Sequence, residues 1–235
     1  IEKIDYEDIK KLVDYNLIEE FKSRALNSEH PVTRGSAQNP DIYFQQREGQ
    51  NKFFEAVPTI VQDYMDKLGE VTGRKYKLFD YYGDKDAEYV IIAMGSVTDT
   101  IRETIDYLRA KSNEKLGVIK VHLYRPFSEK HLLEAIPVSV KKIAVLDRTK
   151  EPGSTGEPLY LDVVKAYQNY DNPPLIVGGR YGLSSKDTRP SQIIAVFNNL
   201  KSSQTMDRFT IGIVDDVNKT SLLEGLAPDG QRTIK

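Results

Sequence analysis

The sequence predicts an α/β fold in which an open, mostly parallel sheet carries helices on both faces. Apolar runs such as Tyr89–Met94 and Lys142–Leu146 have the length and composition of strands buried on both sides. Most of these runs are followed by a segment whose apolar residues recur at helical spacing. Because the connections are short, we expect consecutive strands to be parallel and joined by right-handed crossovers.

The composition excludes several classes of function. The 235 residues include 39% hydrophobic and 29% charged residues, and the formal net charge is -2. These values are ordinary for a soluble globular protein, and they give no electrostatic reason to expect binding to nucleic acid or to an anionic membrane. No apolar run approaches the length of a membrane span, and no signal peptide is visible. The chain begins with Ile1 rather than methionine, so we expect it to be a piece of a longer protein.

The absence of cysteine restricts the chemistry further. It excludes disulfides, a thiolate nucleophile and cysteine-held iron–sulfur clusters within this chain, and it is compatible with a cytoplasmic location. The three histidines, His30, His122 and His131, lack the spacing of a metal site. His122 alternates with apolar residues in a predicted strand and is interpreted as structural. No Ser-His-Asp set is apparent, so we predict no catalytic residue and no metal ligand.

The first third of the chain is predicted to be helical and extended. Residues Ile4–Leu26 carry apolar positions at helical spacing. The segment His30–Phe44 is polar, has a proline near each end, and is interpreted as an ordered loop rather than a helix. Within it, Arg34, Gln38 and Asn39 are candidates for specific polar contacts. Alternatively, they satisfy backbone groups in a long connection.

A further helix is predicted over residues 54–68. We expect Pro58 to kink this helix or to begin its second half, and Gly69 and Gly73 to end it. An aromatic stripe along the helix is interpreted as core rather than as a cofactor site. The stripe consists of Phe53, Phe54 and Tyr64.

The rest of the chain is predicted to supply a sheet of roughly five strands. The strands are expected at Tyr89–Met94, Gly117–Leu123, Lys142–Leu146, Pro174–Val177 and Phe209–Val214. A short extended segment is expected before them, from Tyr76 to Tyr82. Ser96 and Ser128 are placed to cap the helices that follow the first two strands, and Thr188–Pro190 is a plausible start of the last helix.

The loop Asp147–Glu157 connects one predicted strand to the next helix. It is polar, rich in glycine and proline, and carries Arg148 and Lys150. Its last four residues, Ser154–Glu157, have the form of a capping box. The spacing matches neither a P-loop nor G-x-G-x-x-G, so the phosphate-binding signal is weak. Two interpretations stay open: the loop packs against another domain, or it contacts a ligand directly.

The loops at the carboxyl ends of the strands are expected to meet at one edge of the sheet, together with a glycine-rich turn at Gly178–Gly182. Four cations at this edge, Arg125, Arg148, Lys150 and Arg180, form a basic rim. The basic rim could hold a phosphate or carboxylate or dock an acidic domain; alternatively, each cation pairs with a nearby carboxylate or carbonyl. The candidate binding or domain-interface residues are Arg34, Gln38, Asn39, Gly95, Ser96, Arg125, Arg148, Lys150, Gly153, Ser154, Thr155, Gly156, Gly179 and Arg180.

Four segments, taken in order, resemble the pyruvate:ferredoxin (flavodoxin) oxidoreductases. They are His30–Phe44, Tyr124–Phe127, Asp147–Tyr160 and Gly178–Thr188. The resemblance covers an internal slice of that large enzyme and implies its second domain, whose fold is similar to the C-terminal domain of transketolase. It further implies that residues 1–83 are a helical and loop segment from the tail of a preceding thiamine-side domain. Residues 84–217 would then be the transketolase C-terminal-like α/β domain, and residues 218–235 a tail or linker.

The resemblance also implies the activity of the whole enzyme, which is the oxidative decarboxylation of pyruvate to acetyl-CoA with reduction of ferredoxin or flavodoxin. Thiamine diphosphate with magnesium, iron–sulfur clusters and coenzyme A would serve that reaction on other domains of a cytoplasmic homodimer. None of the family's catalytic residues maps onto this chain. By itself the chain is therefore expected to be an inactive structural domain that holds no cofactor and packs against the other domains. The competing interpretation is a module whose basic rim binds the phosphates of coenzyme A or another nucleotide.

Overall fold

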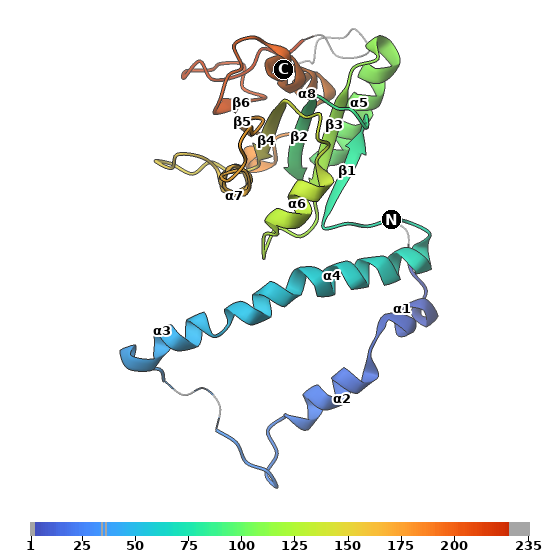
Figure 1. Ribbon diagram of the computed structural model, residues 1–235, viewed down its shortest axis with the longest axis vertical. Helices are drawn as coiled ribbons and strands as arrows, with labels where there is room; N and C mark the ends of the chain where they lie inside the picture. The colour runs from blue at the N-terminus through green and yellow to red at the C-terminus, as the bar shows by residue number, and fades with distance from the viewer. Residues whose placement is uncertain (1–2, 34, 36, 226–235) are drawn as a thin grey trace. The chain divides into compact units, whose positions relative to one another are not determined.

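The computed structural model describes residues 3–33, 35 and 37–225. The chain folds into two compact units, Ile1–Lys77 and Leu78–Lys235. Figure 1 shows that the first unit is built from helices and that the second carries the sheet. The sequence placed the boundary between the two parts after Gly83. In the structure the second unit begins at Leu78, so it also includes the first strand, Phe79–Gly83. None of the helices in the described residues is both long enough and apolar enough to span a membrane.

The first unit begins with two short helices within the segment Ile4–Leu26, which the sequence predicted to be helical. Helix α1 spans Tyr6–Leu12 and helix α2 spans Tyr15–Ser23. The carboxylate of Asp14 accepts hydrogen bonds from the backbone N–H groups of Asn16 (2.9 Å) and Leu17 (3.4 Å). An aspartate that caps a helix start in this way favours a new helix over continuation of the old one.

The segment predicted as a loop up to Phe44 is helical from Pro40 onward. Helix α3 spans Pro40–Glu48 and follows Asn39. Proline suits this position because the first residue of a helix needs no N–H donor and has the φ angle that the pyrrolidine ring imposes. The prediction of a loop was therefore wrong at its C-terminal end, where the proline starts a helix instead of preventing one.

Helix α4 spans Asn51–Thr72, and both Pro58 and Gly69 lie within it. It ends as predicted at Gly73, which adopts the left-handed conformation with φ 70°. The aromatic residues Phe53 and Phe54 are exposed, so their assignment to a core was wrong for the described structure. Helical spacing identifies which residues share a face, but it does not identify what packs against that face.

The second unit contains a six-stranded sheet with the order β1-β3-β2-β4-β5-β6. Only β1 runs antiparallel to its neighbour, so the predicted mostly parallel sheet is confirmed. The extended segment before the first expected strand supplies β1 as an additional strand, and the last expected strand is shorter than predicted. The strands are β1 Phe79–Gly83, β2 Tyr89–Met94, β3 Leu116–Val121, β4 Lys142–Asp147, β5 Leu175–Arg180 and β6 Phe209–Thr210.

Helices cover both faces of this sheet. Helices α5 and α8 pack against each other and against the central strands, while α6 and α7 pack together on the opposite face (Figure 1). Strand β2 lies in the middle, where Ile91 pairs with Val118 of β3 and with Ala144 of β4, and all three side chains are buried. The helices are α5 Val97–Ser112, α6 Glu129–Ala135, α7 Pro158–Ala166 and α8 Pro190–Lys201, and a 3-10 turn spans Leu183–Ser185.

The tail packs onto the sheet unit as far as it is described. Ser221 forms an isolated bridge with Thr210, and the backbone N–H of Leu222 donates to the carbonyl of Thr210 (2.9 Å). The carboxylate of Glu224 accepts a hydrogen bond from the side chain of Gln192 in α8 (2.9 Å). Residues 218–225 thus extend the sheet unit.

The buried phenol of Tyr167, at the C-terminal end of α7, makes the free energy of unfolding depend on pH in the alkaline range. Burial raises the pKa of Tyr167 to about 12, whereas an unfolded tyrosine ionises near pH 10, so unfolding in this range releases a proton and the free energy of unfolding falls as pH rises. We expect Tyr167→Phe to make the fall of melting temperature between about pH 10 and 12 less steep. Tyr170→Phe, which alters the half-exposed ring that contacts Tyr167 edge-to-face, should change this slope much less. Equal slopes for Tyr167→Phe and the unmodified chain would contradict the assignment.

Candidate functional site

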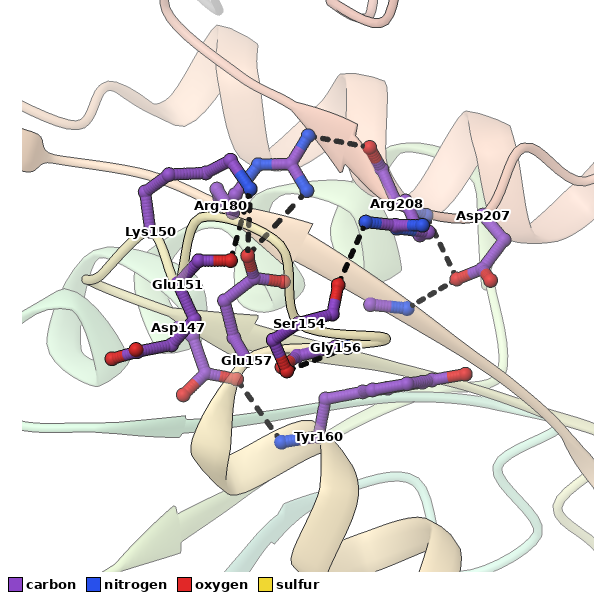
Figure 2. A network of polar contacts seen from close by, with 11 residues as sticks. Asp147, Lys150, Glu151, Ser154, Gly156, Glu157, Tyr160, Arg180, Asp207 and Arg208 are labelled. Atoms are coloured by element: carbon purple, nitrogen blue, oxygen red, sulfur yellow. Dashed lines mark hydrogen bonds and ion pairs between the residues drawn. The ribbon is translucent and has the colours of Figure 1, made fainter.

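The carboxyl ends of the parallel strands meet at one edge of the sheet, as predicted. The chain leaves β2 toward β3 on one side and later returns to β4 on the other side. This reversal of strand order marks the position at which open α/β sheets form a crevice. The β4–α7 loop, Arg148–Glu157, lies at this edge and is the centre of the network in Figure 2.

Asp147 closes the base of the β4–α7 loop. It is the last residue of β4 and is only 3% exposed. Its carboxylate accepts hydrogen bonds from the backbone N–H groups of Leu159 and Tyr160, both at 3.0 Å, at the start of α7. Figure 2 shows the bond from Tyr160. Burial raises the pKa of the Asp147 carboxyl, while these two backbone donors act in the opposite direction. The residue thus joins the end of a strand to the start of the next helix.

The capping box predicted at Ser154–Glu157 does not form. Helix α7 begins at Pro158, so Glu157 occupies the position before the helix, and its side chain makes no capping hydrogen bond. The hydroxyl of Ser154 donates to the carbonyl of Gly156 within the loop (2.7 Å). Asp147, ten residues before Glu157, caps the helix in its place. Ser154–Glu157 has the residue types of a capping box, but the carboxylate of Asp147 accepts the hydrogen bonds from the first backbone N–H groups of α7.

Glu157 is the second buried carboxylate of the site, and it lies between two cations of the predicted basic rim. Its Oε1 is 3.7 Å from the guanidinium of Arg180 and 3.8 Å from the ammonium of Lys150 (Figure 2). Glu157 is 2% exposed and Arg180 is 7% exposed, whereas the Lys150 side chain is largely accessible. A buried carboxylate of this kind requires a compensating charge, which Arg180 provides from the end of β5.

Arg180 also ties the loop to the segment before β6. Its guanidinium donates to the carbonyl of Arg208 (2.7 Å), and the guanidinium of Arg208 donates to the carbonyl of Ser154 (3.1 Å). Asp207 accepts from the backbone N–H groups of Gly178 and Arg208, both at 2.8 Å. Figure 2 shows this chain of contacts from the loop through β5 to the segment before β6.

Two of the three glycines expected to form a turn, Gly178 and Gly179, lie in strand β5, whereas Gly182 follows the strand and has φ 62°. A Cβ atom on Gly179 would overlap the ring of Phe209, and one on Gly178 would lie 3.2 Å from the ring of Tyr160. A Cβ on Gly156 in the loop would likewise overlap the Tyr160 ring. Gly178 and Gly179 therefore admit two aromatic rings on opposite sides of β5, and close packing rather than chain reversal explains these two glycines.

The remaining rim cations also contact nearby protein groups. Arg125 lies over the ring of Tyr124 at 3.9 Å and pairs with Asp162 of α7 at 2.8 Å. The Nε of Arg148 donates to the carbonyl of Gly182 (2.8 Å). Arg125, Arg148 and Arg180 thus each contact a carboxylate or a carbonyl, as in the second of the two interpretations, and the geometry gives no support to the basic rim as a single phosphate site.

The other candidates lie in separate places. Gly95 and Ser96 precede α5 and line a cleft together with Arg148, and Gly95 has φ 74°. Gly153, which has φ 80°, and Thr155 lie in the β4–α7 loop. Asn39 precedes α3 and its side chain makes no capping bond, and Gln38 is half-buried in the first unit. Arg34 lies outside the described residues.

Sequence reasoning missed the two carboxylates and the segment that organise this edge. Asp147 was recognised only as the end of the loop and Glu157 only as part of a capping box, and Asp207 and Arg208 were not recognised at all. An acidic residue directly after a buried strand was the available signal for Asp147. No spacing in the sequence points to Asp207, because its distant partner, Gly178, lies in β5. Within the described residues no group of three histidine, aspartate or glutamate side chains could hold a metal ion.

We predict that Asp147→Ala lowers the free energy of unfolding by about 2 kcal/mol, because two backbone donors at the start of α7 lose their acceptor. Asp147→Asn should cost less, since the amide oxygen can still accept one of these bonds. Urea unfolding of both variants measures the effect, with Asp171→Ala as an exposed control just beyond α7. A loss no larger than that of the control would exclude Asp147 as the cap.

Removing the buried guanidinium should destabilise the sheet unit more than removing an exposed cation. Arg180→Gln leaves the Glu157 carboxylate buried with Lys150 alone, and we expect a cost of about 3–5 kcal/mol. The control is Lys141→Gln, which breaks an exposed pair with Glu88 and should cost less than about 1 kcal/mol. Adding Glu157→Gln to Arg180→Gln should recover part of the loss. Equal losses for Arg180→Gln and Lys141→Gln in urea unfolding would refute the buried pair.

Two family models match the chain in succession. Residues 1–66 match the model described as "Pyruvate flavodoxin/ferredoxin oxidoreductase, thiamine diP-bdg". Residues 87–193, which include the β4–α7 loop, match the model described as "Pyruvate:ferredoxin oxidoreductase core domain II". The expected resemblance, including the identity of the second domain, is thereby confirmed.

Curated relatives agree with these models over nearly the whole chain. A pyruvate-flavodoxin oxidoreductase of Enterobacter agglomerans is 59% identical over 94% of this chain and 19% of its own length. One of Klebsiella pneumoniae is 53% identical over 100% of this chain and 20% of its own. The pyruvate:ferredoxin oxidoreductase of Moorella thermoacetica is 55% identical over 94% and 19%. The chain belongs to the pyruvate:ferredoxin (flavodoxin) oxidoreductase family and spans about a fifth of the length of these relatives.

Proposed function

We propose that this chain is the non-catalytic core part of a longer enzyme that oxidatively decarboxylates pyruvate to acetyl-CoA and reduces ferredoxin or flavodoxin. The observation that carries the proposal is the succession of two models of the same family, over residues 1–66 and 87–193. The names of the curated relatives support the same activity. In this proposal residues 1–83 are the tail of a thiamine-side domain, and residues 84–217 form the second domain.

The geometry of the strand-end edge supports a structural role. Lys150 and Arg180 compensate a buried glutamate, and Arg125 pairs with an aspartate of α7. These side chains hold the loop, the last strands and helix α7 together. We therefore propose that the β4–α7 loop is a preformed surface against which other domains of the same enzyme pack.

The cofactors of the proposed reaction belong to other parts of the enzyme. The chain has no cysteine, so it provides no thiolate ligand for an iron–sulfur cluster. In this proposal no step of the reaction is assigned to a residue of this chain. We further propose that the enzyme is cytoplasmic and homodimeric and uses coenzyme A as a co-substrate.

The purified chain should have no oxidoreductase activity of its own. The assay supplies pyruvate, magnesium, thiamine diphosphate and coenzyme A, and follows the reduction of a viologen dye as the electron acceptor. We expect no pyruvate-dependent reduction, because the chain provides neither clusters nor catalytic groups. Reduction that depends on both pyruvate and coenzyme A would contradict the non-catalytic role.

A second arm of this test uses the full-length enzyme that contains this chain. Arg180→Gln should lower the yield of assembled enzyme, while the KM values for pyruvate and coenzyme A per folded enzyme stay unchanged. The matched control is Lys115→Gln, which alters an exposed cation at the opposite end of the sheet. A higher KM for coenzyme A with normal assembly would instead indicate direct ligand contact.

A further inference from the structure

A cleft of about 540 Å³ opens at the carboxyl ends of β2, β4 and β5. It shares no lining residue with the network of Figure 2, although both lie at the same edge of the sheet. The cleft lies where the strand order reverses between β2 and β4, which is the usual position of ligands in open α/β sheets. Its volume is within the range of sites that enclose small molecules.

The charges at the strand-end edge divide into two groups. Arg125, Lys150 and Arg180 each form an ion pair with a carboxylate. Arg148 and Lys186 both line the cleft, and within the described residues neither forms such a pair. Two cations that lack an acidic partner and face one cleft favour an anion as the ligand.

Arg148 is an exposed side chain that one hydrogen bond anchors beside the cleft. Its Nε donates to the carbonyl of Gly182 at 2.8 Å, which occupies only one of the five N–H donors of the guanidinium. The terminal nitrogens form a planar pair of donors that matches two oxygens of a phosphate group. A guanidinium that is already oriented loses less conformational freedom when a ligand binds.

The rest of the lining suits the same ligand. Gly95 and Ser96, at the start of the 16-residue helix α5, line the cleft, and the positive end of the helix adds to its attraction for anions. The hydroxyl of Tyr181 donates to the carbonyl of Met94 (3.3 Å) and so joins the ends of β5 and β2. Met94 and Leu146 supply apolar surface that can contact the organic part of a phosphate ester.

We propose that this cleft binds the phosphate monoester of a small organic molecule, with the phosphate group between Arg148 and Lys186. The site is independent of the proposed oxidoreductase activity and is not catalytic. Asp187 also lines the cleft and opposes an anion, so it limits the affinity. The proposal therefore predicts two opposite changes in affinity. Removing the charge of Lys186 weakens binding of the anion, and removing the charge of Asp187 strengthens it.

The test is an NMR titration of the isotope-labelled 235-residue chain at low ionic strength. Inorganic phosphate, adenosine monophosphate and uncharged adenosine are added in separate series. We expect saturable shifts of the amide signals of Gly95, Ser96 and Lys186, tighter binding of the monophosphate than of inorganic phosphate, and no binding of adenosine. Lys186→Gln should raise the Kd about two- to fivefold, and Asp187→Asn should lower it by a similar factor. Lys115→Gln, at the opposite end of the sheet, should leave the Kd unchanged.

Several outcomes would overturn the proposal. Shifts that do not saturate, or that spread over the surface without a maximum at the cleft, would show that no site exists. If Lys186→Gln and Lys115→Gln change the Kd equally, phosphate binding depends on the net charge of the protein and not on the cleft. Equal affinity for inorganic phosphate and adenosine monophosphate would refute a site for phosphate esters.

Discussion

The edge of this sheet depends on the burial of two carboxylates that lie ten residues apart in the chain. Asp147 at the end of β4 is compensated by two backbone donors of α7, and Glu157 is compensated mainly by Arg180 from β5. A charge that is removed from water is tolerated only where such partners are fixed. The need to compensate these two carboxylates determines the path of the β4–α7 loop and the start of α7. It also determines the position of the segment before β6.

This requirement separates the cations that maintain the fold from those that are available to a ligand. A row of basic residues at the carboxyl ends of strands resembles a phosphate site in sequence. In the structure, Lys150 and Arg180 are directed at Glu157, whereas Arg148 and Lys186 line a separate cleft. The same residue type thus has two roles at one edge, and the position of the nearest carboxylate decides which role each residue takes.

The helical unit illustrates a different relation between pattern and packing. Helix α4 is amphipathic, as its sequence predicts, yet Phe53 and Phe54 are exposed in the described structure. The spacing of apolar residues shows that one face of a helix is apolar. It does not show which other segment packs against that face. In a chain that spans about a fifth of the length of its relatives, we propose that the partner is the remainder of the thiamine-side domain.

The sequence alone determined the fold class, three of the six strands to within two residues at each end, and the family, because these follow from local periodicity and from long ordered motifs. It also located the edge of the sheet that carries the polar loops. Only the tertiary structure decided that Asp147 rather than Ser154 caps α7, that Gly179 makes room for Phe209, and that Asp207 secures β5. These contacts join residues that are far apart in the chain, and local spacing contains no information about which distant donor or ring arrives at a given position.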